Sequence, residues 1–239
     1  MNRAALVTGA STGMGFAIAR TLGRAGHALT ITSRREDRLE AAAERLRADG
    51  IVVETLAGNM ADEATIEAVV AQHEASFGRL DVLVNNAGMG VPGEIDELTT
   101  KHIDLQLAVN LRAVILGYKH GVPLLRRAGA EHRNALVINT SSVTAERPEH
   151  LLSIYATTKA AVVGLTRAMN VDLGDAGIKS TALCPGYTAT EMTGELQGQI
   201  PAEEMISAED VAGAVGWLLT TTPSCVVPEI PFLRPGFVI

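Results

Sequence analysis

Aromatic residues, cysteines and long apolar runs are all scarce in this sequence. Its 239 residues include one Trp, three Tyr and four Phe, so we expect a core of aliphatic side chains. The two cysteines, Cys184 and Cys225, make no disulfide framework and are typical of a reducing compartment. No apolar run approaches the ~18 residues of a membrane span, and the stretch after Arg3 is too short for a secretory signal. We therefore expect a cytoplasmic chain with no membrane partner.

Positive charge is in short supply as well. Twenty Lys and Arg residues stand against 27 Asp and Glu, and the net charge of −7 argues against nucleic acid as a partner. The six histidines show no metal-ligand spacing, so we expect no metal site. The apolar fraction of 47% and the charged fraction of 20% indicate a globular chain that needs no disulfide to fold.

Short apolar runs alternate along the chain with longer segments of helical periodicity. The runs are rich in Val, Ile and Leu, as are strands buried on both faces of a parallel sheet. We expect strands at Ala4–Thr8, Ala28–Ser33, Ile51–Leu56, Leu80–Asn85, Ala135–Thr140, Ser180–Cys184 and Val226–Leu233. We expect helices at Gly13–Ala25, Asp37–Asp49, Asp62–Phe77, Lys101–Arg127, Ser153–Gly174 and Ala208–Thr221, with Asp62 and Ser207 as N-caps. The alternation predicts a doubly wound α/β fold, and because no linker interrupts it we expect one domain over residues 1–239.

Two short motifs follow expected strands, at the edge where ligands bind in such folds. The segment Thr8–Gly15, Thr-Gly-Ala-Ser-Thr-Gly-Met-Gly, joins the first strand to the first helix. Its glycines allow the backbone to approach a pyrophosphate closely, and the helix N-terminus supplies amide donors, so phosphate binding is favoured over a plain turn. The segment Asn85–Gly88 follows the fourth strand and offers amide groups to a cofactor, although an ordinary Asn/Gly turn has the same composition.

A tyrosine and a lysine lie one helical turn apart in a later segment. Tyr155 and Lys159, at i and i+4, share one helix face, where the ammonium would favour the phenolate and lower the pKa of the phenol. The alternative is a solvated lysine beside a half-buried tyrosine. Ser142 lies thirteen residues before Tyr155, at the end of the fifth expected strand. It brings a hydroxyl to the same crevice, which favours an acid–base site.

The order and spacing of these motifs resemble those of the short-chain dehydrogenase/reductases, from about Arg3 to Thr221. The resemblance rests on Thr8–Gly15, Asn85–Gly88, Asn110, Ser142, the pair Tyr155 and Lys159, and Pro185-Gly186. It implies a Rossmann-like, doubly wound parallel sheet of seven strands in the order 3-2-1-4-5-6-7. It also implies NAD(P)(H)-dependent oxidoreduction between an alcohol and a carbonyl group.

The resemblance implies a catalytic role for each of four residues. Tyr155 would be the general acid/base at the substrate oxygen, and Ser142 would polarise the carbonyl group, with the adjacent Ser141 as the competing candidate. Lys159 would hold the nicotinamide ribose and depress the pKa of Tyr155. Asn110 would hold a water in a proton relay to Lys159, and its alternative is a helix-interior amide bonded to backbone.

The resemblance also assigns cofactor contacts to the strand ends. Within Pro185–Thr190, which would meet the nicotinamide carboxamide, Thr190 would present a hydroxyl and Thr188 its backbone. The expected cofactor-binding residues are Gly9, Ser11, Thr12, Gly13, Met14, Gly15, Ser33, Arg34, Asn59, Met60, Asn86, Ala87, Gly88, Tyr155, Lys159, Pro185, Gly186, Thr188 and Thr190.

The end of the second strand bears on the choice between NADP(H) and NAD(H). NAD binders usually place an acidic side chain there, against the ribose hydroxyls. Here Ser33 takes that position and Arg34 follows, and a guanidinium can bind a 2′-phosphate bidentately. Arg35, Glu36 and Asp37 begin the next helix, so some of these charges are simply solvated in the alternative reading. We expect NADP(H), with NAD(H) as the alternative.

Two positions depart from the usual pattern of the family. Asn59 stands where many relatives have Asp against the adenine, and its amide can still accept and donate a hydrogen bond. Many relatives end with a glycine-rich segment, whereas Val227–Pro235 resembles a minority branch with a Glu-Ile…Arg-Pro ending. That branch includes small-aldehyde reductases and hydroxy-acid or amino-acid dehydrogenases.

The expected substrate is a small carbonyl or alcohol compound, with ketone, aldehyde and hydroxy acid left open. The segment Thr193–Ser207 is short for a lid and indicates a small or open pocket. His150 or Arg147 could hold a substrate carboxylate, although each has a solvated loop charge as its alternative. The expected pocket residues are Met89, Val91, Glu146, Arg147, His150, Leu151, Leu152, Tyr187 and Met192.

The segment Lys101–Arg127 carries more apolar residues than one helical stripe requires. One face is expected on the sheet and another on a partner chain, which with the resemblance suggests a homodimer or homotetramer. A rival function is a catalytically idle NADP(H)-binding regulatory or redox-sensing protein on the same fold. The set Asn110, Ser142, Tyr155 and Lys159 favours the enzyme, because a sensor has no use for a proton relay.

Overall fold

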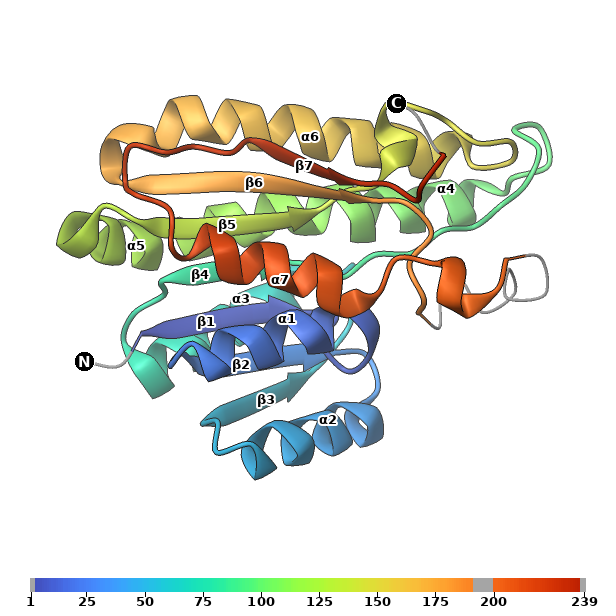
Figure 1. Ribbon diagram of the computed structural model, residues 1–239. Helices are drawn as coiled ribbons and strands as arrows, with labels where there is room; N and C mark the ends of the chain where they lie inside the picture. The colour runs from blue at the N-terminus through green and yellow to red at the C-terminus, as the bar shows by residue number, and fades with distance from the viewer. Residues whose placement is uncertain (1–2, 191–199, 237–239) are drawn as a thin grey trace.

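Seven parallel strands form the centre of the computed structural model, which describes residues 3–190 and 200–236 (Figure 1). In this part of the chain the strand order is β3-β2-β1-β4-β5-β6-β7, as expected from the sequence. The strands are β1 (Ala4–Thr8), β2 (Ala28–Ser33), β3 (Val53–Ala57), β4 (Val82–Asn85), β5 (Ala135–Thr140), β6 (Ile178–Pro185) and β7 (Glu229–Phe232). The helices are α1 (Gly13–Arg24), α2 (Glu36–Ala48), α3 (Glu63–Phe77), α4 (Thr100–Leu107), α5 (Ala113–His132), α6 (Ser153–Leu173) and α7 (Ala208–Leu218). The order confirms a Rossmann-like α/β fold of a single domain.

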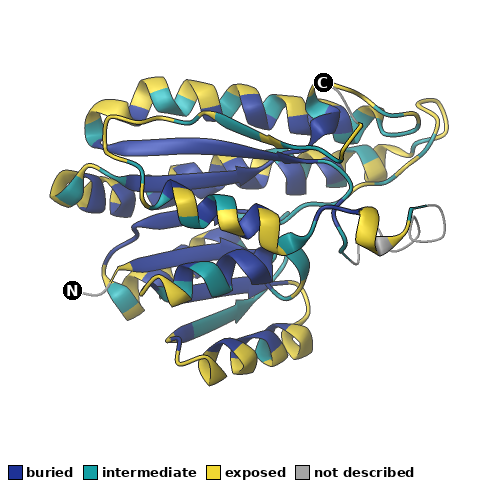
Figure 2. Ribbon diagram, viewed as in Figure 1, coloured by how far each residue is buried: buried dark blue, intermediate teal, exposed yellow. Residues whose placement is uncertain are grey.

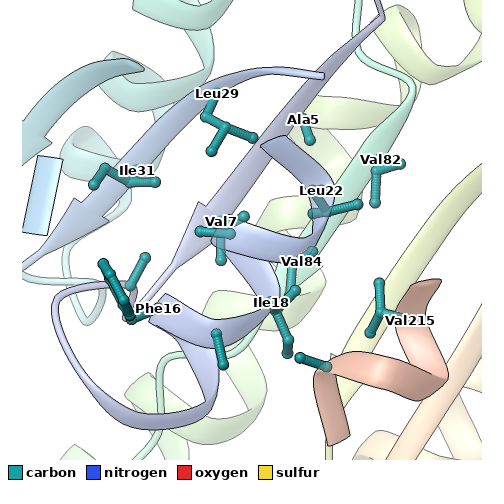
Figure 3. Packing of buried hydrophobic residues seen from close by; sticks show 14 of the residues in the cluster. Ala5, Val7, Phe16, Ile18, Leu22, Leu29, Ile31, Val82, Val84 and Val215 are labelled. Carbon is teal, nitrogen blue, oxygen red and sulfur yellow. The ribbon is translucent and has the colours of Figure 1, made fainter. Parts of the chain in front are cut away.

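The helices cover both faces of the sheet, and an aliphatic core lies beneath each layer. On one face α1, α2 and α7 pack on the strands, and Figure 3 shows Phe16, Ile18 and Leu22 of α1 among strand residues, with Val215 of α7 beside them. On the other face the core joins residues of α3, α5 and α6 to β4, β5 and β6. The five inner strands are buried, the edge strands β3 and β7 are mostly half-buried, and the outward helix faces are exposed (Figure 2). The near-continuous apolar patterns of the inner strands thus have their expected cause.

The helix expected over Lys101–Arg127 is not continuous, and this prediction was wrong. The chain forms α4, then the π-helix η1 (Ala108–Arg112), then α5, which continues to His132. A π-helix widens one turn and leaves backbone groups without their usual α-helical partners, so it commonly occurs at functional sites. Here it places Asn110 in the widened turn.

Other element boundaries shift by a few residues, for local reasons. β4 begins at Val82 rather than Leu80, and the preceding Asp81 accepts a hydrogen bond from the Ala4 amide at 2.8 Å with its carboxylate. β6 is longer than expected, and β7 is shorter than Val226–Leu233. Ser207 caps α7 in a reciprocal capping box with Asp210, whereas Asp62 holds the N-cap position of α3 without a side-chain hydrogen bond.

The carboxyl ends of all seven strands point to one edge of the sheet, because every pairing is parallel. The loops that follow the strands therefore meet there, and they carry the motifs found in the sequence. Among the helices of the described ranges, none is long and apolar enough to cross a membrane.

Candidate active site

The glycine-rich loop after β1 is fastened to the end of β4 by Asn86. Its side-chain amide donates to the carbonyl groups of Thr8 and Gly9, each at 3.1 Å. Its backbone amide donates to the Thr8 hydroxyl at 3.0 Å, and its amide oxygen accepts from Thr140 at the end of β5. Asn86 thus joins three strand ends, which a plain turn would not require.

The same loop forms a cradle that a larger side chain would fill. Gly9 and Gly13 have φ of +67° and +56°, which glycine adopts without strain. A Cβ atom at Gly15 would lie 2.2 Å from the Gly9 carbonyl oxygen, and one at Gly13 would lie 3.1 Å from Cγ2 of Thr190. The side chain of Thr12 does not cap α1, so the first amides of this helix face the cradle uncapped. Uncapped backbone amides at a helix N-terminus, beside glycines that leave space, suit a bound pyrophosphate.

The ends of β2 and β3 lie beside this cradle. Ser33 is buried and its hydroxyl donates to the Arg35 carbonyl at 3.4 Å, while Arg34 is exposed. Arg34 has no ion pair or hydrogen bond within the described residues, whereas Arg35 pairs with Asp37 at 2.6 Å. Arg35 is thus engaged by a neighbouring carboxylate, whereas the described residues leave the Arg34 guanidinium available.

Asn59 and Met60 follow β3, but their side chains are already engaged. The Asn59 side-chain oxygen accepts from the Ala61 amide at 3.1 Å, which shapes the turn into α3. Met60 is buried and packs on Ile66 of α3. Their side chains therefore shape the turn, and the NH₂ group of Asn59 keeps its donors.

The side chains of two adjacent serines at the end of β5 contact different partners. The Ser142 hydroxyl acts on Tyr155 and lowers the pKa of its phenol, and it accepts a hydrogen bond from the Thr144 amide at 3.2 Å. Ser141 instead donates to the backbone carbonyl of Lys159 at 2.8 Å. The structure therefore pairs Ser142, and not Ser141, with the phenol.

The pKa of Tyr155 moves in the direction opposite to that expected. Burial raises it, the hydrogen bond from Ser142 lowers it, and the negative charge of Glu149 raises it. Lys159 Nζ lies 5.5 Å from the centre of the Tyr155 ring, and it donates to the Thr140 carbonyl at 2.8 Å. The expectation that Lys159 depresses this pKa is therefore wrong for the protein alone, because desolvation of the phenol dominates. Tyr155 holds its proton at neutral pH.

Lys159 is almost fully buried, and burial lowers the pKa of its ammonium to about 8. Its ammonium group lies beside Gly88, where a Cβ atom would approach Nζ to 3.3 Å and the Asn110 side-chain oxygen to 3.5 Å. The structure thus brings Lys159, Asn110 and the end of β4 together, at the start of the helix that carries Tyr155.

The side chain of Asn110 is committed to other protein groups. It accepts from the Met89 amide at 2.9 Å and donates to the Met89 carbonyl at 2.8 Å and to Thr158 at 3.1 Å. The alternative interpretation of this residue, an amide bonded to backbone, accordingly describes its side chain. The bonds cross from the π-helix to the loop after β4, so Asn110 fixes that loop over the site.

The loop after β6 also lies at the carboxyl edge of the sheet. Gly186 donates to the Phe232 carbonyl at 3.0 Å, and Thr188 is buried with its hydroxyl on the Gly186 carbonyl at 3.1 Å. Thr190 reaches the glycine cradle at Gly13. The expected nicotinamide loop and the phosphate cradle are therefore neighbours.

The expected pocket residues divide into two groups. One group is half-buried and comprises Met89, Val91, Leu151, Leu152 and Tyr187. The other is exposed and comprises Glu146, Arg147 and His150, with a ring nitrogen of His150 3.8 Å from Glu94. Met192 lies outside the described residues.

Sequence reasoning missed two residues at this side of the site. Glu149 accepts a hydrogen bond from the Tyr187 hydroxyl at 2.7 Å, and the Arg234 guanidinium carbon lies 5.6 Å from the centre of the Tyr187 ring. Only the unusual C-terminal segment signalled Arg234, and nothing in the sequence distinguished Glu149 from its charged neighbours.

Away from this edge, Glu63, Glu67 and His120 bring three ligand atoms within 4.8 Å of one another. Sequence spacing could not reveal the cluster, because its members come from α3 and α5. Glu63 already pairs with Lys119 at 2.8 Å and with Arg112. Cations of the chain itself thus neutralise this carboxylate, and we assign no metal to the cluster.

A doubly wound parallel sheet with a phosphate cradle at its carboxyl edge defines a dinucleotide-binding α/β protein. The family model described as short chain dehydrogenase matches residues 3–200. The chain belongs to the short-chain dehydrogenase/reductase family and is a nicotinamide-dependent oxidoreductase of carbonyl and alcohol groups.

Similar proteins cover almost the whole chain. It is 36% identical over 232 residues to 2-(R)-hydroxypropyl-CoM dehydrogenase of Xanthobacter autotrophicus, with 91% of each chain covered. It is 31% identical over 245 residues to a 3-oxoacyl-(acyl-carrier-protein) reductase of Staphylococcus aureus, with 99% of this chain and 98% of the relative covered. A solved short chain dehydrogenase from Burkholderia cenocepacia in complex with NADP matches with a TM-score of 0.85 at 31% identity, over 95% of this chain and 94% of that one.

Proposed function

We propose that this protein transfers a hydride between NADP(H) and a small carbonyl or alcohol compound, with a site made by Ser142, Tyr155, Lys159 and Asn110. The observation that carries the proposal is the Ser142 hydroxyl close enough to Tyr155 to lower the pKa of the phenol, one helical turn from the buried Lys159. Two hydroxyl groups and an ammonium then face the same edge as the glycine cradle. This is the arrangement that proton transfer to a carbonyl oxygen needs.

When bound, the nicotinamide supplies or accepts the hydride. In the direction of reduction, Tyr155 donates its proton to the substrate oxygen, since its raised pKa keeps the phenol protonated. Ser142 donates a hydrogen bond to the same oxygen and stabilises the negative charge that develops there. Lys159, with a pKa near the working pH, binds the ribose hydroxyls and restores the proton of Tyr155. Asn110 keeps the loop after β4 in place, and the widened turn that holds it positions a water for the relay.

The preference for NADP(H) is supported by charge at the end of β2. Arg34 is exposed and has no acidic partner among the described residues, and Ser33 presents no carboxylate to repel a 2′-phosphate. The relative from Burkholderia cenocepacia binds NADP. The remaining cofactor contacts are those expected from the sequence, of which Gly9 to Gly15 hold the phosphates and Pro185 to Thr190 the nicotinamide.

The rival function, a regulatory or redox-sensing protein, would not need a protonated phenol beside a buried ammonium. A panel assay separates the two functions: ketones and aldehydes are tested for loss of NADPH absorbance, and hydroxy acids with NADP⁺ for its gain. We expect turnover with at least one member of the panel. Tight NADPH binding without turnover on any member would favour the sensor.

We also propose that the chain is a homodimer or homotetramer. Leu107 and Ile115 are 38% and 45% exposed on the helices before and after the π-helix, and Val171 of α6 is 84% exposed. Apolar side chains so exposed on neighbouring helices are suited to contact a second copy. Light scattering at micromolar concentration tests this, and a particle of 25.1 kDa, the mass of one chain, would contradict it.

A further inference from the structure

The C-terminal segment lies against the substrate side of the site. β7 pairs in parallel with β6, with Pro185 opposite Phe232, so both strands end at the same edge. The Gly186 amide donates to the Phe232 carbonyl at 3.0 Å, which fixes the start of the loop after β6 to the end of β7. Figure 1 shows β7 beside β6, and Arg234, two residues after Phe232, lies against the Tyr187 ring.

Arg234, in this segment, is a half-buried cation with free hydrogen-bond donors. Its guanidinium carbon lies 5.6 Å from the centre of the Tyr187 ring, whose hydroxyl is bonded to Glu149. Within residues 3–190 and 200–236, the guanidinium makes no ion pair and donates no hydrogen bond. An aromatic ring holds such a group in place, while its N–H groups remain free for a planar anion.

Arg234 lines a hollow of about 470 Å³ between the C-terminal segment and the start of α7. Met205, Ile206 and Leu233 give the hollow an apolar wall. Arg234 is the only basic side chain among its described lining residues. A hollow of this volume is large enough for a small organic molecule.

Three acidic residues also line the hollow, but none of them neutralises Arg234. Glu203 and Glu204 are exposed to solvent, and Asp210 is held by Ser207 in the capping box of α7. Glu149, behind Tyr187, accepts the hydrogen bond of that hydroxyl. Among the described residues, none of these carboxylates forms an ion pair with the Arg234 guanidinium.

Gly186 lies between one lining residue of the hollow, Ile206, and the strand end that carries Ser142. A Cβ atom at Gly186 would lie 3.6 Å from Cδ1 of Ile206 and 3.8 Å from Cγ2 of Val143, the residue after Ser142. On the other side, the charge of Glu149 acts on both Tyr155 and Tyr187. A substrate whose oxygen meets Ser142 and Tyr155 can therefore extend past Gly186 into the hollow.

We propose that Arg234 binds a carboxylate of the substrate, so that the protein acts on oxo acids and hydroxy acids rather than on neutral carbonyl compounds. The proposal rests on the proposed function and assigns Arg234 as its specificity-determining residue. The apolar wall takes the carbon chain between the reacting group and the carboxylate. The guanidinium forms charge-assisted hydrogen bonds with both carboxylate oxygens.

The test compares acids with their own methyl esters. Initial rates with NADPH are measured for 3-oxobutanoate, 4-oxopentanoate and 5-oxohexanoate and for the three esters, since the series varies the distance between the carbonyl group and the charge. We expect the wild type to prefer at least one acid over its ester. Arg234→Gln should lower kcat/KM for that acid by ~10–100-fold and change the value for the ester by less than about threefold. Arg234→Lys should recover part of the loss.

Arg126→Gln, an exposed arginine on α5 with no partner in the described structure, is the matched control for the loss of one positive charge. Equal losses on acid and ester in Arg234→Gln, or no preference for any acid in the wild type, would overturn the proposal. So would a preference for aminoacetone, which would assign the hollow to a cation through its acidic residues.

A binding measurement separates this proposal from the proposed function. The complex of the protein with NADP⁺ is titrated with hexanoate and with hexanamide by calorimetry. Binding of hexanoate that Arg234→Gln abolishes supports the carboxylate site even if no compound of the panel is reduced, in which case only the proposed function fails. Equal binding of acid and amide would overturn the carboxylate site whatever the activity.

Discussion

The two halves of the carboxyl edge are held together in different ways. In the cofactor half, the loop after β1 is fixed by backbone groups and one amide side chain: Ala10 donates to the Thr32 carbonyl at 3.1 Å, and Asn86 bonds to Thr8 and Gly9. In the substrate half, three segments distant in sequence meet through side chains, namely Glu149, Tyr187 and Arg234. The first half depends mainly on backbone groups and one amide side chain, and the second depends on the identity of three side chains.

This difference separates what the fold provides from what the individual protein adds. A cradle built from backbone groups and glycines accepts the same pyrophosphate in any protein with that loop. Contacts among Glu149, Tyr187 and Arg234 can change by single substitutions without disturbing the sheet. We therefore expect variants of the cofactor half to affect binding and folding, and variants of the substrate half to affect turnover and choice of substrate.

The largest expected effect is that of Tyr155→Phe. The change removes the proton donor and keeps the ring, so turnover should fall by at least ~10²–10⁴-fold while NADPH affinity stays within about threefold. Steady-state rates and fluorescence titration of NADPH measure the two quantities. Near-normal turnover in this variant would remove Tyr155 from the mechanism, and a parallel loss of NADPH binding would break the division between the two halves.

Gly15→Ala tests the cofactor half. The new Cβ atom would lie 2.2 Å from the Gly9 carbonyl oxygen and 2.5 Å from Nδ2 of Asn86, so the cradle must move. We expect NADPH to bind at least ~10-fold more weakly and the free energy of unfolding to fall by ~3 kcal/mol. Urea unfolding and NADPH titration measure both effects.

Gly213→Ala is the matched control, because Gly213 is exposed on α7 and a Cβ atom there would contact nothing within 4 Å. It should stabilise the protein by ~0.5–1 kcal/mol and leave NADPH affinity unchanged, since alanine favours the helix. Similar effects of the two substitutions would show that the cradle is more tolerant than its distances indicate.

The same division explains how far the sequence could predict the structure. Strand order followed from the family resemblance, whereas local patterns gave the strands themselves, and β1, β2 and β5 begin and end as expected. The π-helix at Asn110 was missed, because its cause is a set of bonds to Met89 and Thr158 in other segments. The sign of the Tyr155 pKa shift was missed as well, since burial is a tertiary property that the i, i+4 spacing does not contain.

Lys159 lies where the two halves meet, and its titration should be visible in stability. Its pKa is 10.5 in the unfolded chain and about 8 in the folded protein, because burial disfavours the ammonium. Between these values the unfolded chain binds a proton that the folded protein lacks, so the free energy of unfolding should rise from pH 8 to about 10.5. The rise is ~3 kcal/mol for a shift of this size. Below pH 8 both states are protonated and this contribution is constant.

The comparison of wild type with Lys159→Met isolates that contribution. Urea unfolding between pH 7 and about 10.5, without cofactor, should give a difference between the two proteins that grows in favour of the wild type. Curves that stay parallel over this range would mean that the ammonium is solvated in the folded protein. The junction between the halves would then be open to water.

The smallest expected effect concerns the choice of cofactor at the end of β2. Arg34 is exposed, so solvent screens its charge, and Arg34→Ala should raise the KM for NADPH by only ~10-fold and leave that for NADH within about twofold. Ser33→Asp places a carboxylate where the 2′-phosphate would lie, and should shift the preference towards NADH by a similar factor.

Arg126→Ala, which removes a charge from α5, is the control and should change neither KM. Because Ser33 and Arg34 belong to the cofactor half, kcat with a saturating cofactor should hold in all three variants. A wild type that already prefers NADH would contradict the role given to this strand end, and a fall in kcat would show that the cofactor half also governs turnover.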